Sequence, residues 1–291
     1  MKIGILTRNE NAWCSARLGE AFKKKGVFPF FFNFNQLTTQ VGFQPPFLIK
    51  GVDPLKELSS LLVRPIGRGS LEEIIFQINT LHRLYSKGLN VINKPSAIEK
   101  AVDKYYALAL LEDSGIPIPK TIVTENPEEA LLAFKKFKDI VVKPMFGSRG
   151  IGIARISNLD IAERSFRTLR FFKHVIYVQE YIHHGVKDLR AFIIDGKVIA
   201  AMYRIASTWK TNVSLGAKPV KAKLSKEAEE LAVKAAEALG CEIAGVDLLE
   251  SNKGLIVNEV NSQPGWRGLQ KTTKVDIASE IANYVISKAK R

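Results

Sequence analysis

The first third of the chain alternates short apolar runs with amphipathic stretches. The apolar runs are rich in β-branched and aromatic residues, which predicts strands. They are Lys2–Thr7, Phe28–Phe32, Leu61–Arg64 and Val91–Ile92. Helices are predicted between them, at about 12–25 and 70–87. This alternation predicts a small parallel α/β sheet in an N-terminal domain of residues 1–95, with the Pro- and Gly-rich segment 40–53 as a loop or an edge excursion.

The middle of the chain continues the alternation of helices and strands. Residues 96–114 are predicted as a helix that begins with Ser96 as N-cap and Glu99 three residues on, and that ends at Gly115. Four strands are then expected, near 121–123, 140–143, 151–156 and 175–180. We take residues 96–184 as a second, central subdomain.

Mostly antiparallel structure is expected from about residue 185 onward. Leu189–Ile194 and Lys197–Tyr203 flank Asp195-Gly196, which is a strong hairpin signal. A helix at about 225–239, a second strand pair and a last helix at about 275–289 follow. The chain is therefore predicted to be of mixed α/β (α+β) class, with residues 185–291 as a third subdomain.

The second strand pair carries two carboxylates and an amide in one register. Its strands, 243–250 and 255–260, are largely apolar, and a three-residue loop, 252–254, would join them. That loop places Asp247 opposite Glu259, and Asn261 lies on the same face two residues further on. Three hard oxygen ligands then converge, as in Mg²⁺ sites that bind substrate phosphates. A surface hairpin with ordinary solvated carboxylates is the alternative.

A glycine-rich stretch between two predicted strands suits a phosphate ligand. It contains Gly147, Ser148, Arg149, Gly150 and Gly152. Glycines let the backbone approach a ligand closely, free amides there could bind phosphate oxygens, and Arg149 adds positive charge. The stretch does not have the Walker sequence, and it leads into a strand rather than a helix, unlike the dinucleotide fingerprint. An ordinary turn is the alternative.

Two lysines and the end of a strand could complete a nucleotide site. Lys143 ends an apolar run, where a lysine either extends its head to water or has an anionic partner. Lys104 lies on the helix 96–114, where a solvated lysine is the default. Backbone groups and an acid where the strand 175–180 ends could read an adenine and a ribose. The residues there are Gln179, Glu180, Tyr181 and Ile182.

Composition and charge narrow the class of protein. The 291 residues are 46% hydrophobic and 25% charged, which is ordinary globular composition. The chain has no apolar run of about eighteen residues, and its N-terminus runs into charge too soon for a signal peptide. Two cysteines, Cys14 and Cys241, are too few for a disulfide framework, so we expect a cytoplasmic protein without a membrane span.

The formal charge of +14, from 43 basic and 29 acidic residues, suits anionic partners such as a nucleotide. The sequence has no zinc-finger pattern and no platform of interleaved basic and aromatic residues, and its basic runs are most simply the solvated faces of helices. Binding to nucleic acid is therefore disfavoured.

Six segments carry a resemblance to a known family. They are AVDKYYALALLEDSGIPIPKT, VVKPMFGSRGIGI, VQEYI, KDLRAFIIDGKVIAAMYR, AGVDLL and NEVNSQPGWRG. Together they resemble the RimK-like α-L-glutamate ligases of the ATP-grasp superfamily, and the resemblance covers nearly the whole chain. The ending GWRGLQ is most similar to archaeal members that add glutamate to pterin (tetrahydromethanopterin) or deazaflavin coenzymes. The resemblance implies an ATP-grasp fold with an N-terminal Rossmann-like pre-ATP-grasp subdomain, and a homo-oligomer, either a dimer or a tetramer.

The resemblance also implies roles for the candidate residues around ATP. Lys104 and Lys143 would bind phosphates, and 147–152 would close over them. Glu180 and Tyr181 would contact the adenine, flanked by Gln179 and Ile182, and Asp188 would bind the ribose. The metal ligands Asp247, Glu259 and Asn261 would hold two Mg²⁺ or Mn²⁺ ions. The remaining cleft residues would be Arg190 and Arg204 at the reacting carboxylate, with Lys210 and Asn212 nearby.

The implied reaction is an ATP-dependent ligation of L-glutamate to a small-molecule carboxylate acceptor through an acyl phosphate. Arginines that match carboxylates bidentately would hold an anionic acceptor; these are Arg17, Arg64 and Arg267. Trp266 could stack on a planar ring, or it could be a core tryptophan beside a surface salt bridge.

Three other functions stay open at this point. The same chemistry could act on a protein C-terminal tail, an amino-group carrier protein or a growing poly-α-glutamate chain. The chain could instead be a non-catalytic ATP-binding regulator, although all three metal ligands and both lysines are present. A basic nucleic-acid-binding protein is the third possibility, and tight, salt-sensitive binding to random duplex would support it.

Overall fold

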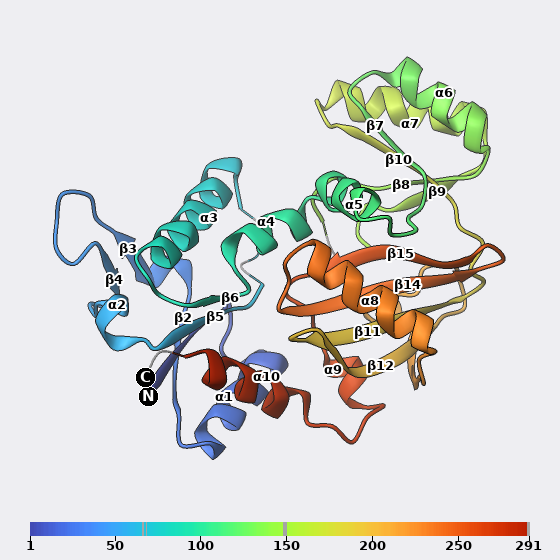
Figure 1. The fold of residues 1–291 in the computed structure, drawn as a ribbon. Coiled ribbons are helices and arrows are strands. Elements are labelled where there is room, and N and C mark those ends of the chain that lie inside the picture. The colour runs from blue at the N-terminus through green and yellow to red at the C-terminus, as the bar shows by residue number, and fades with distance from the viewer. Residues whose placement is uncertain (66, 68, 148–149, 290–291) are drawn as a thin grey trace.

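The computed structural model describes residues 1–65, 67, 69–147 and 150–289, and it contains three main sheets (Figure 1). The N-terminal sheet has the order β2-β1-β5-β6, and all of its strands are parallel. Its elements are β1 (Lys2–Leu6), α1 (Trp13–Lys24), β2 (Phe28–Phe32), β5 (Ser60–Val63), α3 (Leu71–Ser86) and β6 (Val91–Ile92). The small parallel sheet expected from the sequence is confirmed.

An excursion between β2 and β5 forms its own small hairpin. It contains η1 (Phe34–Gln36), β3 (Leu37–Thr39), β4 (Phe47–Ile49) and α2 (Pro54–Glu57). The loop predicted over 40–53 therefore includes a strand that pairs antiparallel with β3. Phe47 and Ile49 are fully buried under this hairpin, and burial of these two side chains outweighs the Pro and Gly signals around them.

The central sheet has the order β7-β10-β8-β9 and is antiparallel throughout. Two helices cover one face of it, as Figure 1 shows in green. The elements are α4 (Pro95–Val102), α5 (Lys104–Asp113), β7 (Thr121–Thr124), α6 (Pro127–Phe137), β8 (Ile140–Val142), β9 (Ala154–Ile156), α7 (Leu159–Phe171) and β10 (Ile176–Glu180). The strand predicted from 151 begins only at Ala154.

The single helix predicted over 96–114 is in fact two helices, and this prediction was wrong. Asp103 has extended backbone angles, and its carboxylate accepts hydrogen bonds from the amides of Tyr105 and Tyr106, so it caps α5 instead of continuing α4. Ser96 is not the N-cap either, because α4 begins at Pro95.

The C-terminal sheet has the order β13-β12-β11-β14-β15 and is antiparallel. Alanines of α8 pack closely on one face of it. The elements are β11 (Lys187–Ile194), β12 (Lys197–Ile205), η2 (Val213–Leu215), β13 (Lys218–Lys221), α8 (Lys226–Ala238), β14 (Ile243–Ser251), β15 (Gly254–Asn261), α9 (Arg267–Gln270) and α10 (Ile277–Lys288).

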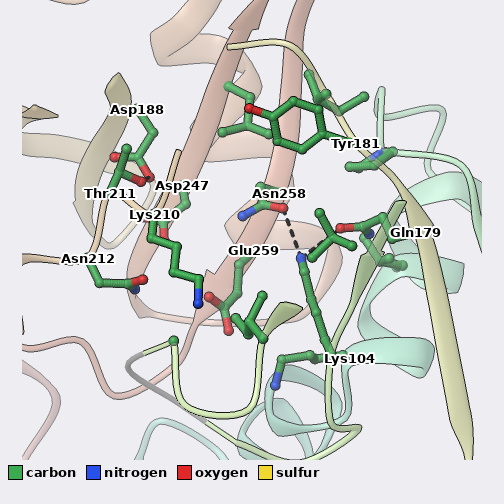
Figure 2. A pocket seen from close by; sticks show the side chains of 18 of the residues that line it. Lys104, Gln179, Tyr181, Asp188, Lys210, Thr211, Asn212, Asp247, Asn258 and Glu259 are labelled. Atoms are coloured by element: carbon green, nitrogen blue, oxygen red, sulfur yellow. Dashed lines mark hydrogen bonds between the residues drawn. The ribbon is translucent and has the colours of Figure 1, made fainter. Parts of the chain in front are cut away.

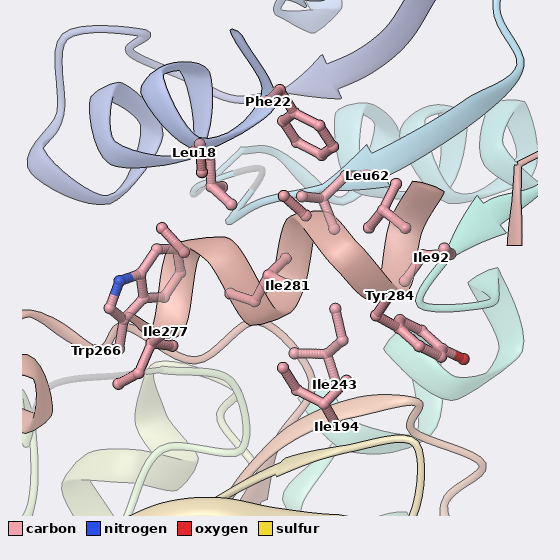
Figure 3. Close-up of a cluster of buried hydrophobic side chains, with 14 of the residues drawn as sticks. Leu18, Phe22, Leu62, Ile92, Ile194, Ile243, Trp266, Ile277, Ile281 and Tyr284 are labelled. Carbon is pink, nitrogen blue, oxygen red and sulfur yellow. The ribbon is translucent and has the colours of Figure 1, made fainter. Parts of the chain in front are cut away.

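The last helix joins the C-terminal part to the N-terminal part. Ile277 and Ile281 of α10 are buried in one cluster with Leu18 and Phe22 of α1 and with Ile243 of β14 (Figure 3). The α10 helix thus shares a core with the N-terminal sheet although it lies in the predicted range 185–291. The division at residues 95 and 184 stays a prediction.

Asn93, directly after β6, fixes the same junction by hydrogen bonds. Its amide Nδ2 donates to the carbonyls of Ile243 at 2.7 Å and Ser262 at 2.5 Å, and its Oδ1 accepts from the amide of Ile243 at 2.8 Å. All of the donors and the acceptor of this buried side chain are used. The N-terminal sheet is therefore tied to the strands that carry the predicted metal ligands.

No helix among the described residues is long and apolar enough to cross a membrane.

Candidate active site

A large cavity lies where the central sheet, α5 and the C-terminal sheet meet (Figure 2). It encloses about 1170 Å³ of empty space, its open mouth included. Most of the predicted nucleotide and metal residues line it. They are Lys104, Lys143, Gly147, Gly150, Gln179, Glu180, Tyr181, Ile182, Asp188, Arg204, Lys210, Asn212, Asp247 and Glu259.

The hairpin β14–β15 pairs Asp247 with Glu259, as the sequence predicts. The turn that produces this register differs from the predicted one. Ser251 pairs with Gly254, so the turn has two residues instead of three, and a bulge at Asn258 then adds the missing residue. The bulge turns the Asn258 side chain toward Lys143, whose Nζ donates to Asn258 Oδ1 at 3.3 Å. The shorter turn and the bulge shift the register by one residue in opposite directions, so Asp247 still lies opposite Glu259.

Asp247 is buried and paired with two arginines. Arg190 donates to both of its carboxylate oxygens, and Arg204 Nη2 lies 2.9 Å from Oδ2. Burial alone would raise the pKa of Asp247, but the charges of Arg190 and Arg204 outweigh it and hold the pKa below its ordinary value. Asp247 is therefore ionised, and its charge is shared between two guanidinium groups.

Asp188, which is expected to bind the ribose, is also buried, at 3% exposure. Arg204 donates to both Asp188 oxygens, and Thr211 Oγ1 donates to Oδ2 at 2.6 Å. Burial would lower the pKa of Arg204, but Asp247 and Asp188 raise it above its ordinary value. Asp188 lines the cavity, yet its lone pairs are used to orient Arg204.

The two lysines approach the cavity from different elements. Lys143 Nζ donates to Gln179 Oε1 at 2.7 Å as well as to Asn258, so its neighbours are amide oxygens and no carboxylate among the described residues lies within ion-pair distance. Burial lowers the pKa of Lys143 to about 8, although Glu259 and Asp247 act against this shift. Burial also lowers the pKa of Lys104, which donates to Gly147 O at 2.9 Å. These two ammonium groups form no ion pair among the described residues and face the same cavity, which suits a polyphosphate.

Glu259 and Asn261 lie on one face of β15, two residues apart. Among the described residues Glu259 makes no hydrogen bond or ion pair, and Asn261 uses only its amide nitrogen, which donates to Gly245 O at 3.3 Å. The two unpaired carboxylate oxygens of Glu259 thus lie at the cavity beside Asp247, whereas Asn261 is not part of the cavity lining. Hard oxygens of this kind fit Mg²⁺, although the described residues contain no cluster of three His, Cys, Asp or Glu side chains that could hold an ion without amide or phosphate oxygens.

The glycine-rich stretch meets the loop after β12. Gly150 has φ +74°, and a Cβ atom placed on it would lie 2.6 Å from Asn212 Oδ1. A larger residue would therefore push the two segments apart. Gly152, with φ +77°, is not part of the cavity lining. Ser148 and Arg149 lie outside the described residues.

The residues that end β10 and follow it line one part of the cavity. Tyr181 donates its backbone amide to Asp139 O at 3.0 Å, and the guanidinium of Arg155 lies 3.6 Å from its ring centroid. Glu180 accepts from the backbone amide of Lys120 at 2.8 Å. The side chain of Gln179 is buried and accepts a hydrogen bond from Lys143.

Two of the predicted acceptor residues are already engaged inside the protein. Arg17 pairs with Glu20 at 2.6 Å and with Asp276 at 3.7 Å, so its charge is compensated. Trp266 is fully buried, and it contacts Phe192 edge to face. Its ring has no free face for an acceptor, so the core tryptophan is the reading that the structure supports.

The other two acceptor candidates, Arg64 and Arg267, form no ion pair among the described residues. Arg64 is buried to 4% exposure and donates to Pro264 O at 2.9 Å. Arg267 begins α9, is exposed and forms no ion pair among the described residues.

Sequence reasoning missed three residues of the site. Thr211, Asn258 and Trp209 all line the cavity. No motif singles out Thr211, because its role depends on the fold of the loop after β12. Asn258 was placed opposite Leu248 by the three-residue turn, and only the bulge turns it to Lys143.

Comparisons with known proteins agree with this geometry. Residues 101–285 match the model of the RimK-like ATP-grasp domain. The chain is 37% identical to the tetrahydromethanopterin:alpha-L-glutamate ligase of Methanocaldococcus jannaschii over 100% of both chains, and 33% identical to that of Methanosarcina acetivorans over 98% of both.

Solved structures show the same fold. The ATP-grasp ligase PsnB with a minimal precursor has a TM-score of 0.78 at 20% identity, over 99% of both chains. A RimK domain ATP-grasp protein from Sphaerobacter thermophilus has a TM-score of 0.76 at 20% identity, over 98% of this chain and 100% of that one. The ATP-grasp fold expected from the sequence is confirmed. The chain belongs to the RimK-like ATP-grasp family and is an ATP-dependent ligase.

Proposed function

We propose that this ligase joins L-glutamate to a carboxylate of a pterin or deazaflavin coenzyme. The observation that carries the proposal is the full-length identity of 33–37% to ligases named for tetrahydromethanopterin and α-L-glutamate, in a chain whose cavity gathers two lysines and the Asp247–Glu259 pair. Relatives named only as probable α-L-glutamate ligases, such as that of Legionella pneumophila, are 31% identical.

The proposed reaction has two steps. A carboxylate oxygen of the acceptor attacks the γ-phosphorus of ATP, the bond to the β,γ-bridging oxygen breaks, and ADP leaves. The amine of L-glutamate then attacks the acyl carbon, loses a proton and expels inorganic phosphate. Activation by ATP is needed because a carboxylate is a poor electrophile. No nucleophilic side chain is required, since phosphoryl transfer depends mainly on positioning and charge neutralisation.

The residues of the cavity can supply both requirements. Lys104 and Lys143 would neutralise the phosphates; burial lowers the pKa of both, and Glu259 only partly offsets this shift. Asp188 and Asp247 hold Arg204 in one orientation, so its guanidinium would need little reorganisation when charge develops on an acyl oxygen. Arg190 lies on β11 directly opposite Asp247 and pairs with it, and it would act beside Arg204.

Asp247, Glu259 and Asn261 would hold two Mg²⁺ ions, which Mn²⁺ could replace. A bound divalent ion would neutralise phosphate charge and orient the reacting phosphoryl group. The free oxygens of Glu259 and Asn261 support this assignment most directly. Asp247 would serve the ions only in competition with Arg190 and Arg204. Glu180, Tyr181 and Ile182 would contact the adenine, and Lys210 and Asn212 would close the cleft opposite the glycine-rich stretch.

A peptide acceptor is the second candidate. Solved structures of the same fold bind precursor peptides, among them PsnB and MdnC. Those proteins are at most 20% identical to this chain, so the likeness concerns the fold. The subunit number, a dimer or a tetramer, is part of the proposal and light scattering would measure it.

The test measures ADP release with Mg-ATP and L-glutamate against a panel of acceptors: tetrahydromethanopterin, a reduced deazaflavin coenzyme, an acidic peptide and glutamate alone. Glutamate-dependent ADP release with a pterin or deazaflavin, and a product heavier by one glutamyl residue, would establish the proposed function. Turnover with the peptide alone would replace it by the second candidate. ATP binding without ADP release from any pair would refute both and favour a non-catalytic regulator.

A further inference from the structure

The ammonium group of Lys143 is held by two side-chain amides that come from different sheets. Gln179 lies on β10 of the central sheet and accepts from Lys143 Nζ at 2.7 Å. Asn258 lies at the bulge of β15 in the C-terminal sheet and accepts from the same nitrogen at 3.3 Å (Figure 2). All three residues line the cavity. The position of this cation between the two sheets is therefore set by two amide oxygens.

The orientation of the Gln179 amide is fixed by its other partners. An ammonium group can only donate, so the amide oxygen must face Lys143 and the amide nitrogen must point away from it. That nitrogen donates to Thr121 Oγ1 at 2.9 Å and to Tyr177 Oη at 3.2 Å. The Thr121 hydroxyl in turn donates to Pro119 O at 2.9 Å. Because Gln179 is 2% exposed and both polar atoms of its side chain are used, it cannot turn without breaking hydrogen bonds inside the central sheet.

The arginines beside the cavity are held in a different way. Arg204 pairs with Asp188 and Asp247, and Arg190 pairs with Asp247, so carboxylates compensate both guanidinium groups. Among the described residues Lys143 forms no ion pair, and its two partners are neutral. A carboxylate in place of either amide would also accept from the lysine, but it would neutralise the charge as well. Neutral oxygens position the cation and leave its charge for a ligand.

We propose that Gln179 and Asn258, here called the amide pair, are positioning residues of the ligase: their oxygens hold the Lys143 ammonium at the phosphates of ATP and leave its positive charge to the nucleotide. This inference rests on the proposed function, which assigns Lys143 to the phosphates. Glu259 acts on Lys143 without forming an ion pair, and in the proposed function its own charge is taken up by Mg²⁺. The alternative is a purely structural tie, in which the amide pair joins the two sheets and the nucleotide makes no use of the charge.

Replacement of Gln179 by glutamate separates these two roles. The introduced side chain has the same shape and still accepts from Lys143. The hydroxyls of Thr121 and Tyr177 can turn their protons toward it, since a hydroxyl both donates and accepts. A structural tie is therefore kept in Gln179→Glu. The charge of Lys143, however, is then paired inside the protein and is no longer free for a phosphate.

Calorimetry of the full chain at pH 7 measures the binding of Mg-AMPPNP, and adenosine, titrated separately, reports on the part of the site that holds no phosphate. Asn126→Asp is the control for added charge. Asn126 is exposed, is not part of the cavity lining, and caps α6 by accepting from the amide of Glu128, which an aspartate does equally well. The control thus adds the same charge to a helix that packs on the central sheet.

We expect Gln179→Glu to bind Mg-AMPPNP at least about tenfold more weakly than wild type and Asn126→Asp, because the phosphates lose a charge-assisted hydrogen bond. Its affinity for adenosine and its melting temperature should match those of Asn126→Asp. Equal affinity of Gln179→Glu and wild type for Mg-AMPPNP would overturn the proposal. An equal loss of affinity for adenosine would also overturn it, since that result indicates a distorted cavity.

Asn258→Ala is a second test, which also serves if Gln179→Glu does not fold. Asn258 is half-buried, and Lys143 is its side-chain partner among the described residues, so the substitution leaves the backbone pairing of β15 intact. The ammonium is then held by Gln179 alone. We expect the affinity for Mg-AMPPNP to fall about threefold to tenfold, with adenosine unaffected. Unchanged affinity for Mg-AMPPNP would remove Asn258 from the amide pair and refute the proposal as stated.

Steady-state kinetics distinguish a failure of the amide pair from a failure of the proposed function. With tetrahydromethanopterin as acceptor, Gln179→Glu should raise the KM for ATP at least about tenfold and leave the KM for L-glutamate unchanged. An unchanged KM for ATP would overturn the role of the amide pair and retain the ligase. Weaker Mg-AMPPNP binding in Gln179→Glu, together with no ADP release by wild type from any acceptor, would refute the proposed ligation and retain the amide pair.

Discussion

Proton uptake by Lys143 can be used to test whether the cavity binds a nucleotide. Its ammonium group donates to Gln179 and Asn258, and burial lowers its pKa from the ordinary 10.5 to about 8. Glu259 and Asp247 raise this pKa and Lys104 lowers it, but burial is the largest influence. When a polyphosphate enters, negative charge beside the ammonium favours its protonated form, so the pKa must rise. Nucleotide binding is therefore coupled to proton uptake.

The magnitude follows from the two pKa values. In the free protein at pH 9, about one lysine side chain in ten at this position is protonated, because the pKa of about 8 lies one unit below the pH. If bound phosphates restore the pKa to 10.5, each molecule takes up about 0.9 protons at pH 9 and about 0.1 at pH 7. The full shift, 10.5 minus about 8, corresponds to roughly 3 kcal/mol of binding energy, which is lost as the pH rises from 8 through 10.5.

Isothermal titration calorimetry of AMPPNP with Mg²⁺, in two buffers of different ionisation enthalpy, measures this uptake. At pH 9 the phosphates of the nucleotide are already deprotonated, so they do not contribute. Lys143→Met should remove most of the buffer-dependent heat, and Lys104→Met should remove a smaller part, since the pKa of Lys104 is also lowered. Equal heats in both buffers for wild type at pH 9 would show that Lys143 is not the deprotonated, phosphate-facing lysine described above.

Three further changes test neighbouring parts of the structure. Glu259→Gln removes the charge that raises the pKa of both lysines, so proton uptake on nucleotide binding should become larger at pH 7, and ADP release should fall by at least about tenfold at fixed Mg²⁺; unaltered calorimetry would contradict this. Thr211→Val removes the hydrogen bond to Asp188 and should lower the free energy of unfolding in urea by about 1.5–3 kcal/mol, while Thr211→Ser should restore most of it. Trp266→Ala empties a fully buried site and should cost about 3–5 kcal/mol in the same assay, with Trp266→Phe losing much less; a near-neutral alanine variant would mean that Trp266 is not a core residue.

Periodicity was enough to predict most of the elements because they follow local rules. The strand 28–32 was predicted from a run of aromatic residues and the hairpin around Asp195-Gly196 from a two-residue turn, and both are present. The break at Asp103 was not predicted, because a single carboxylate accepting two amides outweighs the helix propensity of the residues around it. The strand Phe47–Ile49 was missed because burial under a loop cannot be read from sequence.

The candidate site was predictable where it depends on spacing along one strand and not where it depends on contacts between elements. Asp247, Glu259 and both lysines reach one cavity, as the spacing suggested. The buried partners of Asp188 and Gln179 were not predicted, because nothing in the sequence reveals that Arg204 and Lys143 use those side chains. Arg17 was assigned to the acceptor for the same reason, since its pairing with Asp276 joins two distant helices.

The bulge at Asn258 has a consequence for the chemistry of the whole hairpin. Without it, the two-residue turn would place Asn258 opposite Asp247, and every later residue of β15 would point to the other face. Glu259 and Asn261 would then enter the packing against α8, and their polar atoms would be buried without partners. With the bulge, the carboxylate remains in the cavity and the extra residue supplies an oxygen to Lys143. One inserted residue thus sets both the position of the Glu259 carboxylate and the amide oxygen that Lys143 contacts, while burial keeps the pKa of Lys143 low.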